Sequence, residues 1–151
     1  MKKQNILEPA AAQGIIARVA NLRVDSQRQW GTMEVTEMLL HCNLANNGLL
    51  EADLPYRRPT VKQWLLRKIG LRVISRIPRG RKGPARLETK GKIDVSAFER
   101  ERQRFIETVS KFPQHGKPLK GVHPAMGSMR QREWGTLTWM HMDHHLRQFG
   151  V

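Results

Sequence analysis

Apolar residues recur at intervals of three and four positions in four long stretches of the chain, the spacing that places them on one face of an α-helix. These stretches are residues 9–22, 34–51, 94–112 and 134–149. None of them alternates with the two-residue period of a half-buried strand, so we predict no strand pair. The pattern predicts an all-α protein built as an antiparallel four-helix bundle.

Residues near the ends of these stretches predict where the helices begin. Pro9 suits the first turn of the first helix, because its fixed φ fits the helix and its missing N–H is not needed there. Thr32 is a candidate N-cap for the second helix, Asp94 or Ser96 for the third, and Ser128 for the last.

A basic segment, residues 55–92, separates the second and third bundle helices. From residue 57 to residue 92 it holds thirteen lysines and arginines against one acid, Glu88. Residues 61–77 can form an additional short basic helix, while residues 78–92 have Pro and Gly but no hydrophobic period and predict a mobile surface loop. We therefore expect a single bundle domain, residues 1–151, with residues 55–92 as a basic insert.

Composition narrows the class of protein. The 151 residues suffice for one domain with a real core, and 27 basic against 13 acidic residues give a net charge of +14. The single cysteine, Cys42, excludes an intrachain disulfide and suits a reducing compartment. No apolar run is long enough to span a bilayer, and the N-terminus has no apolar signal core. We expect a cytoplasmic protein with no membrane partner.

Three histidines in the apolar stripes are the candidate chemistry. His141 and His145 are four residues apart in the last helix, so both imidazoles point to the same face and can reach one ion. His41 lies in the apolar stripe of the second helix. Neutral nitrogens from two bundle helices would bind a divalent metal ion and leave coordination positions open for water or substrate.

The neighbours of the pair have alternative roles. His144 is a rival for one ligand place, a rim residue, or a donor behind the ligands, and Gln148 could orient His145 or contact a ligand. Asp143 points elsewhere and is expected at the surface or near a helix N–H. The plainer interpretation is that these histidines only pack or face solvent, since an i, i+4 pair alone is a weak signal.

Two blocks of the chain, residues 30–42 and 123–149, together resemble a known family. The residues that carry the resemblance are Trp30-Gly-Thr-Met, Met38-Leu-Leu-His41-Cys42, His123-Pro, Gly127, Glu133-Trp134-Gly and His141-Met-Asp-His144-His145-Leu-Arg-Gln148-Phe149. They are similar to the DinB-like metalloenzyme superfamily, and within it to an uncharacterised bacterial branch.

This resemblance implies a four-helix bundle with one ligand on its second helix and an H-x-x-x-H pair on its last. Those places fall on His41, His141 and His145 in this chain. It implies nickel, zinc or iron as the metal and a small-molecule substrate, since characterised members include thiol-dependent S-transferases and isomerases. The basic insert is the departure from a typical member.

Two functions follow as hypotheses. The first is a metal-dependent enzyme, a hydrolase or an S-transferase, that activates water or a low-molecular-weight thiol at His41, His141 and His145. The alternative is a nucleic-acid or anionic-surface binding module that uses residues 57–92, although a solvated basic loop is the plainer interpretation of that segment. Bundles of this kind often pair, so a homodimer also stays open.

Overall fold

The structure is a computed structural model that describes residues 3–80 and 83–151 of the chain. Within these residues the protein is mostly helical, with one small sheet. The α-helices are α1 (Pro9–Ala20), α2 (Val35–Leu50), α3 (Val61–Arg72), α4 (Phe98–Lys111) and α5 (Gln131–Gln148). Three short 3₁₀ turns, η1 (Ala85–Leu87), η2 (Val95–Ala97) and η3 (Phe112–Gln114), and two strands, β1 (Val122–His123) and β2 (Gly127–Ser128), complete it. None of the described helices is long and apolar enough to cross a membrane.

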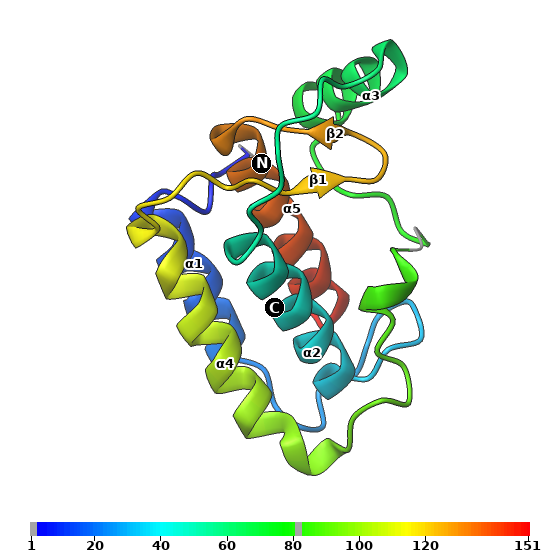
Figure 1. Cartoon of the computed structure of the whole chain (residues 1–151). Helices are drawn as coiled ribbons and strands as arrows, with labels where there is room; N and C mark the ends of the chain where they lie inside the picture. The colour runs from blue at the N-terminus through cyan, green and yellow to red at the C-terminus, as the bar shows by residue number, and fades with distance from the viewer. Residues whose placement is uncertain (1–2, 81–82) are drawn as a thin grey trace.

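Helices α1, α2, α4 and α5 lie side by side and share one hydrophobic core (Figure 1). Each contributes fully buried side chains, such as Ile15 from α1, Leu39 from α2, Phe105 from α4 and Leu146 from α5. These residues come from the apolar stripes of the sequence, so the helical period determines which face of each helix is buried. The four long helices are where the sequence predicted them, to within a few residues.

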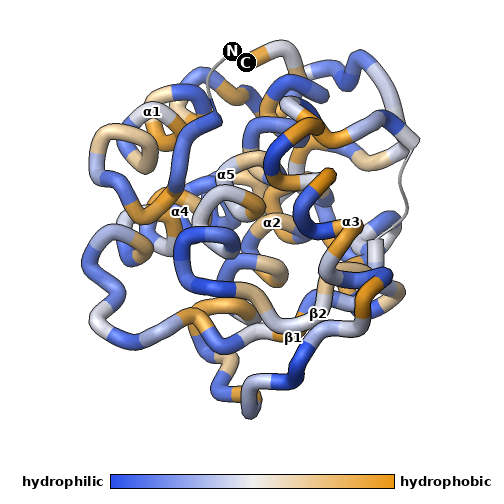
Figure 2. Tube along the Cα trace, turned by 90° about the horizontal axis from the view of Figure 1, so that it is seen from above, coloured by the Kyte–Doolittle hydropathy of each residue, from blue (hydrophilic) through white to orange (hydrophobic). Residues whose placement is uncertain are grey.

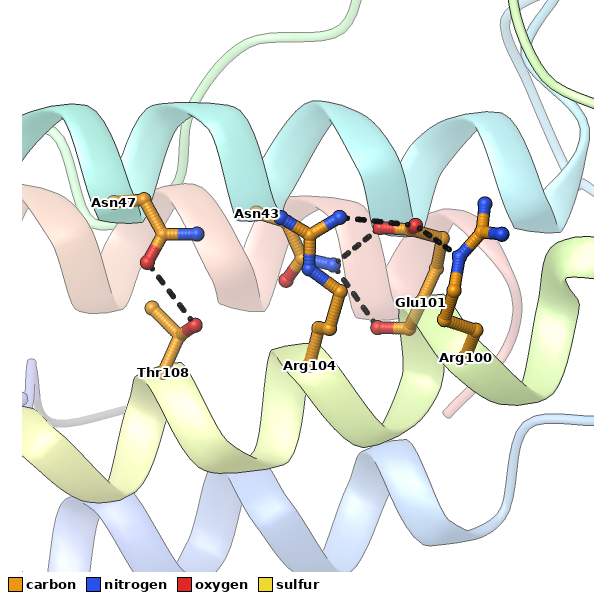
Figure 3. A network of polar contacts seen from close by, with 6 residues as sticks. All are labelled: Asn43, Asn47, Arg100, Glu101, Arg104 and Thr108. Atoms are coloured by element: carbon orange, nitrogen blue, oxygen red, sulfur yellow. Dashed lines mark hydrogen bonds and ion pairs between the residues drawn. The ribbon is translucent and has the colours of Figure 1, made fainter.

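A buried polar network joins α2 to α4 (Figure 3). The Glu101 carboxylate is almost fully buried, and Asn43 Nδ2 donates to its Oε2 and to its backbone oxygen, both at 2.9 Å. Arg100 and Arg104 approach Glu101 Oε1 from the solvent side at 3.3 Å. These contacts satisfy a buried charge that would otherwise be costly, and they fix how α4 is rotated against α2.

Asp143 is an anchor between α1 and α5, and the sequence prediction of a surface or capping role was wrong. Its carboxylate is buried and pairs with Arg18 of α1 and with Arg147 one turn further along α5, both at 2.9 Å. Because a buried carboxylate needs such partners, Asp143 holds α5 at a fixed rotation against α1.

The structure contains a strand pair that the sequence did not predict. β1 and β2 are antiparallel, and Gly127 pairs with His123 at a φ of 70°, a conformation that favours glycine. With two residues per strand there is no alternating pattern to detect. Ser128 lies in β2, so the N-cap of α5 is Arg130 and the predicted cap was wrong.

Of the other predicted helix starts, some agree with the structure and one does not. Pro9 opens α1 as predicted, and the Asp94 side chain accepts a hydrogen bond from Ser96 N at the start of η2. The N-cap of α2 is Glu34 instead of Thr32, because the Glu34 N–H donates to Glu37 at 2.7 Å and closes the first turn.

Helix α3 lies beside the β1–β2 hairpin at one end of the molecule (Figures 1 and 2). It is held there by Arg67, whose Nη1 donates to Ser128 O at 2.7 Å. The predicted basic helix is therefore present, but it ends at Arg72 instead of residue 77. Of the basic residues counted in the insert, Arg81 and Lys82 lie outside the described residues.

Candidate metal centre

The structure brings His41 of α2 together with His141 and His145 of α5. One ring nitrogen from each of the three residues lies within 4.8 Å of the other two, and the ring centroids are 4.7–5.0 Å apart. His41 and His145 are buried, and His141 is partly buried. One helical turn separates His141 from His145, so a single rotation of α5 directs both towards α2.

The spacing of the rings fits a small divalent ion. His41 Nε2 and His141 Nε2 are 3.0 Å apart. Two nitrogens bound to one ion at about 2.1 Å are about 3.0 Å apart at a right angle and about 3.4 Å apart at a tetrahedral angle. The observed separation therefore matches two neighbouring positions of one coordination sphere.

The tautomer of His41 is fixed by a backbone carbonyl. His41 Nδ1 lies 2.7 Å from Leu87 O in η1. A carbonyl oxygen can only accept a hydrogen bond, so Nδ1 carries the proton and donates it. Nε2 is left with a lone pair, and Nε2 is the atom that faces His141. This is the arrangement in which a histidine binds a metal.

His145 is fixed in the same way through a relay. Gln148 Nε2 donates to Trp30 O at 2.7 Å, which places the amide oxygen on the other side. That oxygen lies 3.0 Å from His145 Nδ1, so Nδ1 carries the proton and donates to it. The lone pair of His145 is therefore on Nε2. Of the two roles that the sequence left open for Gln148, this contact favours the orientation of His145.

His144 lies outside the group of three. Its Nδ1 donates to Ile77 O at 3.1 Å, and its ring packs edge-on against Trp30 and His145. Arg79 also packs on Trp30, with its guanidinium carbon 4.0 Å from the centre of the ring. His144 thus packs against His145 and does not converge with the other imidazoles.

Burial keeps the histidines of the site neutral. Desolvation lowers the pKa of His41, His141 and His144, and lowers the pKa of His145 to about 3. For His141 the neighbouring imidazoles, first that of His145, lower the pKa further, because two charged rings would repel each other. Near neutral pH the rings are in the form that can bind a metal.

Part of the basic insert packs on this site, although the sequence predicted residues 78–92 as a surface loop. Thr89 is fully buried, and its hydroxyl donates to Glu37 O at 2.8 Å. The Gly91 N–H donates to the Glu37 carboxylate at 2.6 Å. These bonds hold the segment against α2 and bring Leu87 O to His41, while most neighbouring side chains remain exposed.

Cys42 and His123 lie outside the group of three histidines. Cys42 is buried in the core, and burial raises the pKa of its thiol, so it is a packing residue and not a nucleophile. His123 lies in β1, where its Nδ1 accepts hydrogen bonds from Ala125 N and Met126 N. The residues that sequence reasoning missed are Leu87, Ile77 and Trp30, which act through backbone carbonyls.

Comparison with known proteins shows the family. A family model described as "Protein of unknown function (DUF1569)" matches residues 1–150. No curated protein and no solved structure matches the chain. Since the match extends over all but the last residue, the chain belongs to this family of unknown function.

Proposed function

We propose that this protein is a metal-dependent enzyme in which His41, His141 and His145 hold one divalent ion, nickel, zinc or iron. We also propose that α1, α2, α4 and α5 form an antiparallel four-helix bundle of the DinB-like kind. The resemblance of residues 30–42 and 123–149 to that superfamily supports this assignment, and so does the placement of one histidine on α2 and two on α5.

The observation that carries the proposal is the direction of the three rings. The Nδ1 atoms of His41 and His145 each donate a hydrogen bond to an oxygen on the side of the ring away from the site. The Nε2 atoms of His41 and His141 lie 3.0 Å apart. The lone pair of His41 Nε2 faces His141 Nε2 at this distance, and such a contact is favourable only if a proton or a cation lies between the two nitrogens. A divalent ion satisfies all three imidazoles, whereas one shared proton satisfies two.

Three histidine ligands are more typical of a catalytic metal site than of a structural one. Three protein nitrogens leave at least one coordination position open, whereas structural sites use four protein ligands. A divalent ion held there would lower the pKa of a water molecule or a low-molecular-weight thiol and supply a nucleophile near neutral pH. The chain's own part is to hold His41 through Leu87 O and His145 through Gln148 before any substrate arrives. We propose a small-molecule substrate and a hydrolase or S-transferase reaction.

Metal-dependent thermal stabilisation tests the proposal. Metal-free protein is melted alone and with Ni²⁺, Zn²⁺ or Fe²⁺, and the bound metal is measured by elemental analysis. At an ion concentration of about 100 times Kd, binding adds about 2.7 kcal/mol, which raises Tm by roughly 5–10 °C in a chain of this size.

The His141→Ala variant should lose this shift. His115→Ala is the matched control, because His115 lies outside the group of three at the end of η3, and it should keep the full shift. Both variants are first melted without metal to show that they fold. If no ion raises Tm, or if His141→Ala responds as His115→Ala does, the metal-dependent function is wrong.

A further inference from the structure

Helix α3 directs a row of large apolar side chains into solvent. Six large apolar residues are between 41% and 82% exposed: Val61, Trp64, Leu65, Leu66, Ile69 and Val73. Its inner side is small, since Arg67 and Gly70 are the buried residues of the helix. Five of the six exposed residues lie on α3 and the sixth, Val73, is its C-cap, and exposed apolar residues concentrated in this way mark interaction surfaces.

The same face is strongly basic. Helix α3 contains four lysines and arginines and no acid. At 100° per residue, Lys62, Leu65, Ile69 and Arg72 fall within about 80° of one another around the helix. Hydrophobic and hydrophilic positions therefore alternate along α3, as Figure 2 shows. A partner must offer both an apolar layer and negative charge.

A basic groove adjoins this face on the side of α5. It has a volume of about 390 Å³. Its lining residues are Arg67, Lys68, Leu71, Arg72, Arg130, Arg132, Glu133 and Thr136. Five of these are cations, and Glu133 is the only acid among the described residues that line the groove.

Arg67 is already engaged by the protein. Its side chain is nine-tenths buried, its Nη1 donates to Ser128 O at 2.7 Å, and its Nε forms an ion pair with Glu133 at 3.5 Å. Lys68, Arg72, Arg130 and Arg132 are therefore the lining cations that remain for a phosphate oxygen.

We propose that the exposed face of α3 and this groove bind the surface of an anionic lipid bilayer. In this arrangement Leu65 and Ile69 enter the boundary between head groups and acyl chains. Lys62 and Arg72 remain at the level of the phosphates, where their flexible stems can reach. The groove then takes a lipid phosphate. The sequence analysis expected no membrane partner because no segment can span a bilayer, but binding at the surface needs no spanning segment and agrees with the anionic-surface alternative for residues 57–92.

Two other partners fit the face less well. A second copy of the chain would place two clusters of cations against each other, which costs free energy. A nucleic acid would match the cations, but its phosphate backbone offers no apolar layer to cover Leu65 and Ile69. A bilayer that contains anionic lipid satisfies both features.

Sedimentation with vesicles tests this proposal. The full-length protein is mixed with vesicles of phosphatidylcholine alone, or with about 30% phosphatidylglycerol added, at low and high salt. We expect binding to the anionic vesicles, weakened at least tenfold by high salt, and little binding to the neutral ones. Trp64 emission should shift to the blue on binding, and Trp64→Phe should remove that shift.

The variant Leu65→Gln/Ile69→Gln separates the apolar contribution from the charge. We expect it to bind anionic vesicles at least tenfold more weakly, because two side chains no longer enter the apolar layer. Leu44→Gln is the matched control, since Leu44 is comparably exposed on α2, and it should bind as the unmodified protein does. Both changes are at exposed sites, and melting curves show that the fold is kept.

Several results would overturn the proposal. One is equal binding to neutral and anionic vesicles, and another is an unchanged affinity of the double variant. Binding to duplex or single-stranded nucleic acid but not to vesicles would assign the face to nucleic acid. A dimer in light scattering that Leu65→Gln/Ile69→Gln dissociates would assign it to a second copy. None of these results bears on the metal centre, which lies elsewhere on α2 and α5.

Discussion

Replacing Gln148 by leucine removes the relay that orients His145 while keeping a side chain of similar size. Gln148 is buried and makes two hydrogen bonds, one to Trp30 O at 2.7 Å and one from His145 Nδ1 at 3.0 Å. Leucine leaves a buried acceptor and a buried donor unsatisfied, each at about 1–3 kcal/mol. We expect the free energy of unfolding without metal to fall by about 2–6 kcal/mol.

The same change should weaken metal binding. His145 would no longer be held in the tautomer that presents Nε2, and loss of such a partner typically costs 10–100-fold in affinity. We expect a rise in Kd for Zn²⁺ of about that size, measured by calorimetry on folded protein. Urea unfolding of the metal-free protein measures the change in the free energy of unfolding separately.

Two further variants sharpen the test. Gln148→Glu keeps an acceptor for His145 but loses the donor to Trp30 O, so it should be destabilised yet retain its metal affinity. Gln103→Leu is the control, because Gln103 is exposed on α4, and it should change neither quantity. A Kd for Gln148→Leu within twofold of the unmodified protein would refute the role of the relay.

Three further predictions concern stability. Burial lowers the pKa of His145 to about 3 from 6.5. Between pH 3 and pH 6.5 the unfolded chain therefore binds more protons than the folded protein. The free energy of unfolding should fall by about 1 kcal/mol per pH unit as the pH drops from 6.5 towards 3. Urea titrations of metal-free protein across this range check it, and a flat profile would contradict it. Asn43→Ala should lower the free energy of unfolding by about 1–3 kcal/mol, because Glu101 no longer receives the two hydrogen bonds that Asn43 donates. Thermal unfolding checks this, and a change below about 0.5 kcal/mol would show that the network is dispensable. Phe105→Ala should cost about 3–5 kcal/mol, because Phe105 is fully buried, and chemical unfolding should show it.

The sequence predicted those features of the site that depend on helical spacing. Residues four apart on a helix share a face, so the pairing of His141 with His145 could be read directly. The stripe position of His41 placed it in the core, and the i, i+3 step from His145 indicated Gln148. In each case the side chain itself carries the signal.

The sequence could not predict the parts of the site that are backbone. Leu87, Ile77 and Trp30 act through carbonyl oxygens, which every residue has, so no residue type marks their role. The position of Leu87 depends on how residues 83–91 pack against α2, through contacts such as that of Thr89 with Glu37 O. Such contacts between segments distant in sequence have no local period.

X-ray diffraction at the absorption edge of the bound metal tests the central claim most directly. Crystals grown with one equivalent of Ni²⁺ or Zn²⁺ should show a single anomalous peak between α2 and α5. The peak should lie about 2.0–2.2 Å from one nitrogen each of His41, His141 and His145. A crystal that contains the metal at full stoichiometry elsewhere, with His41 Nε2 and His141 Nε2 still joined directly at 3.0 Å, would contradict the claim.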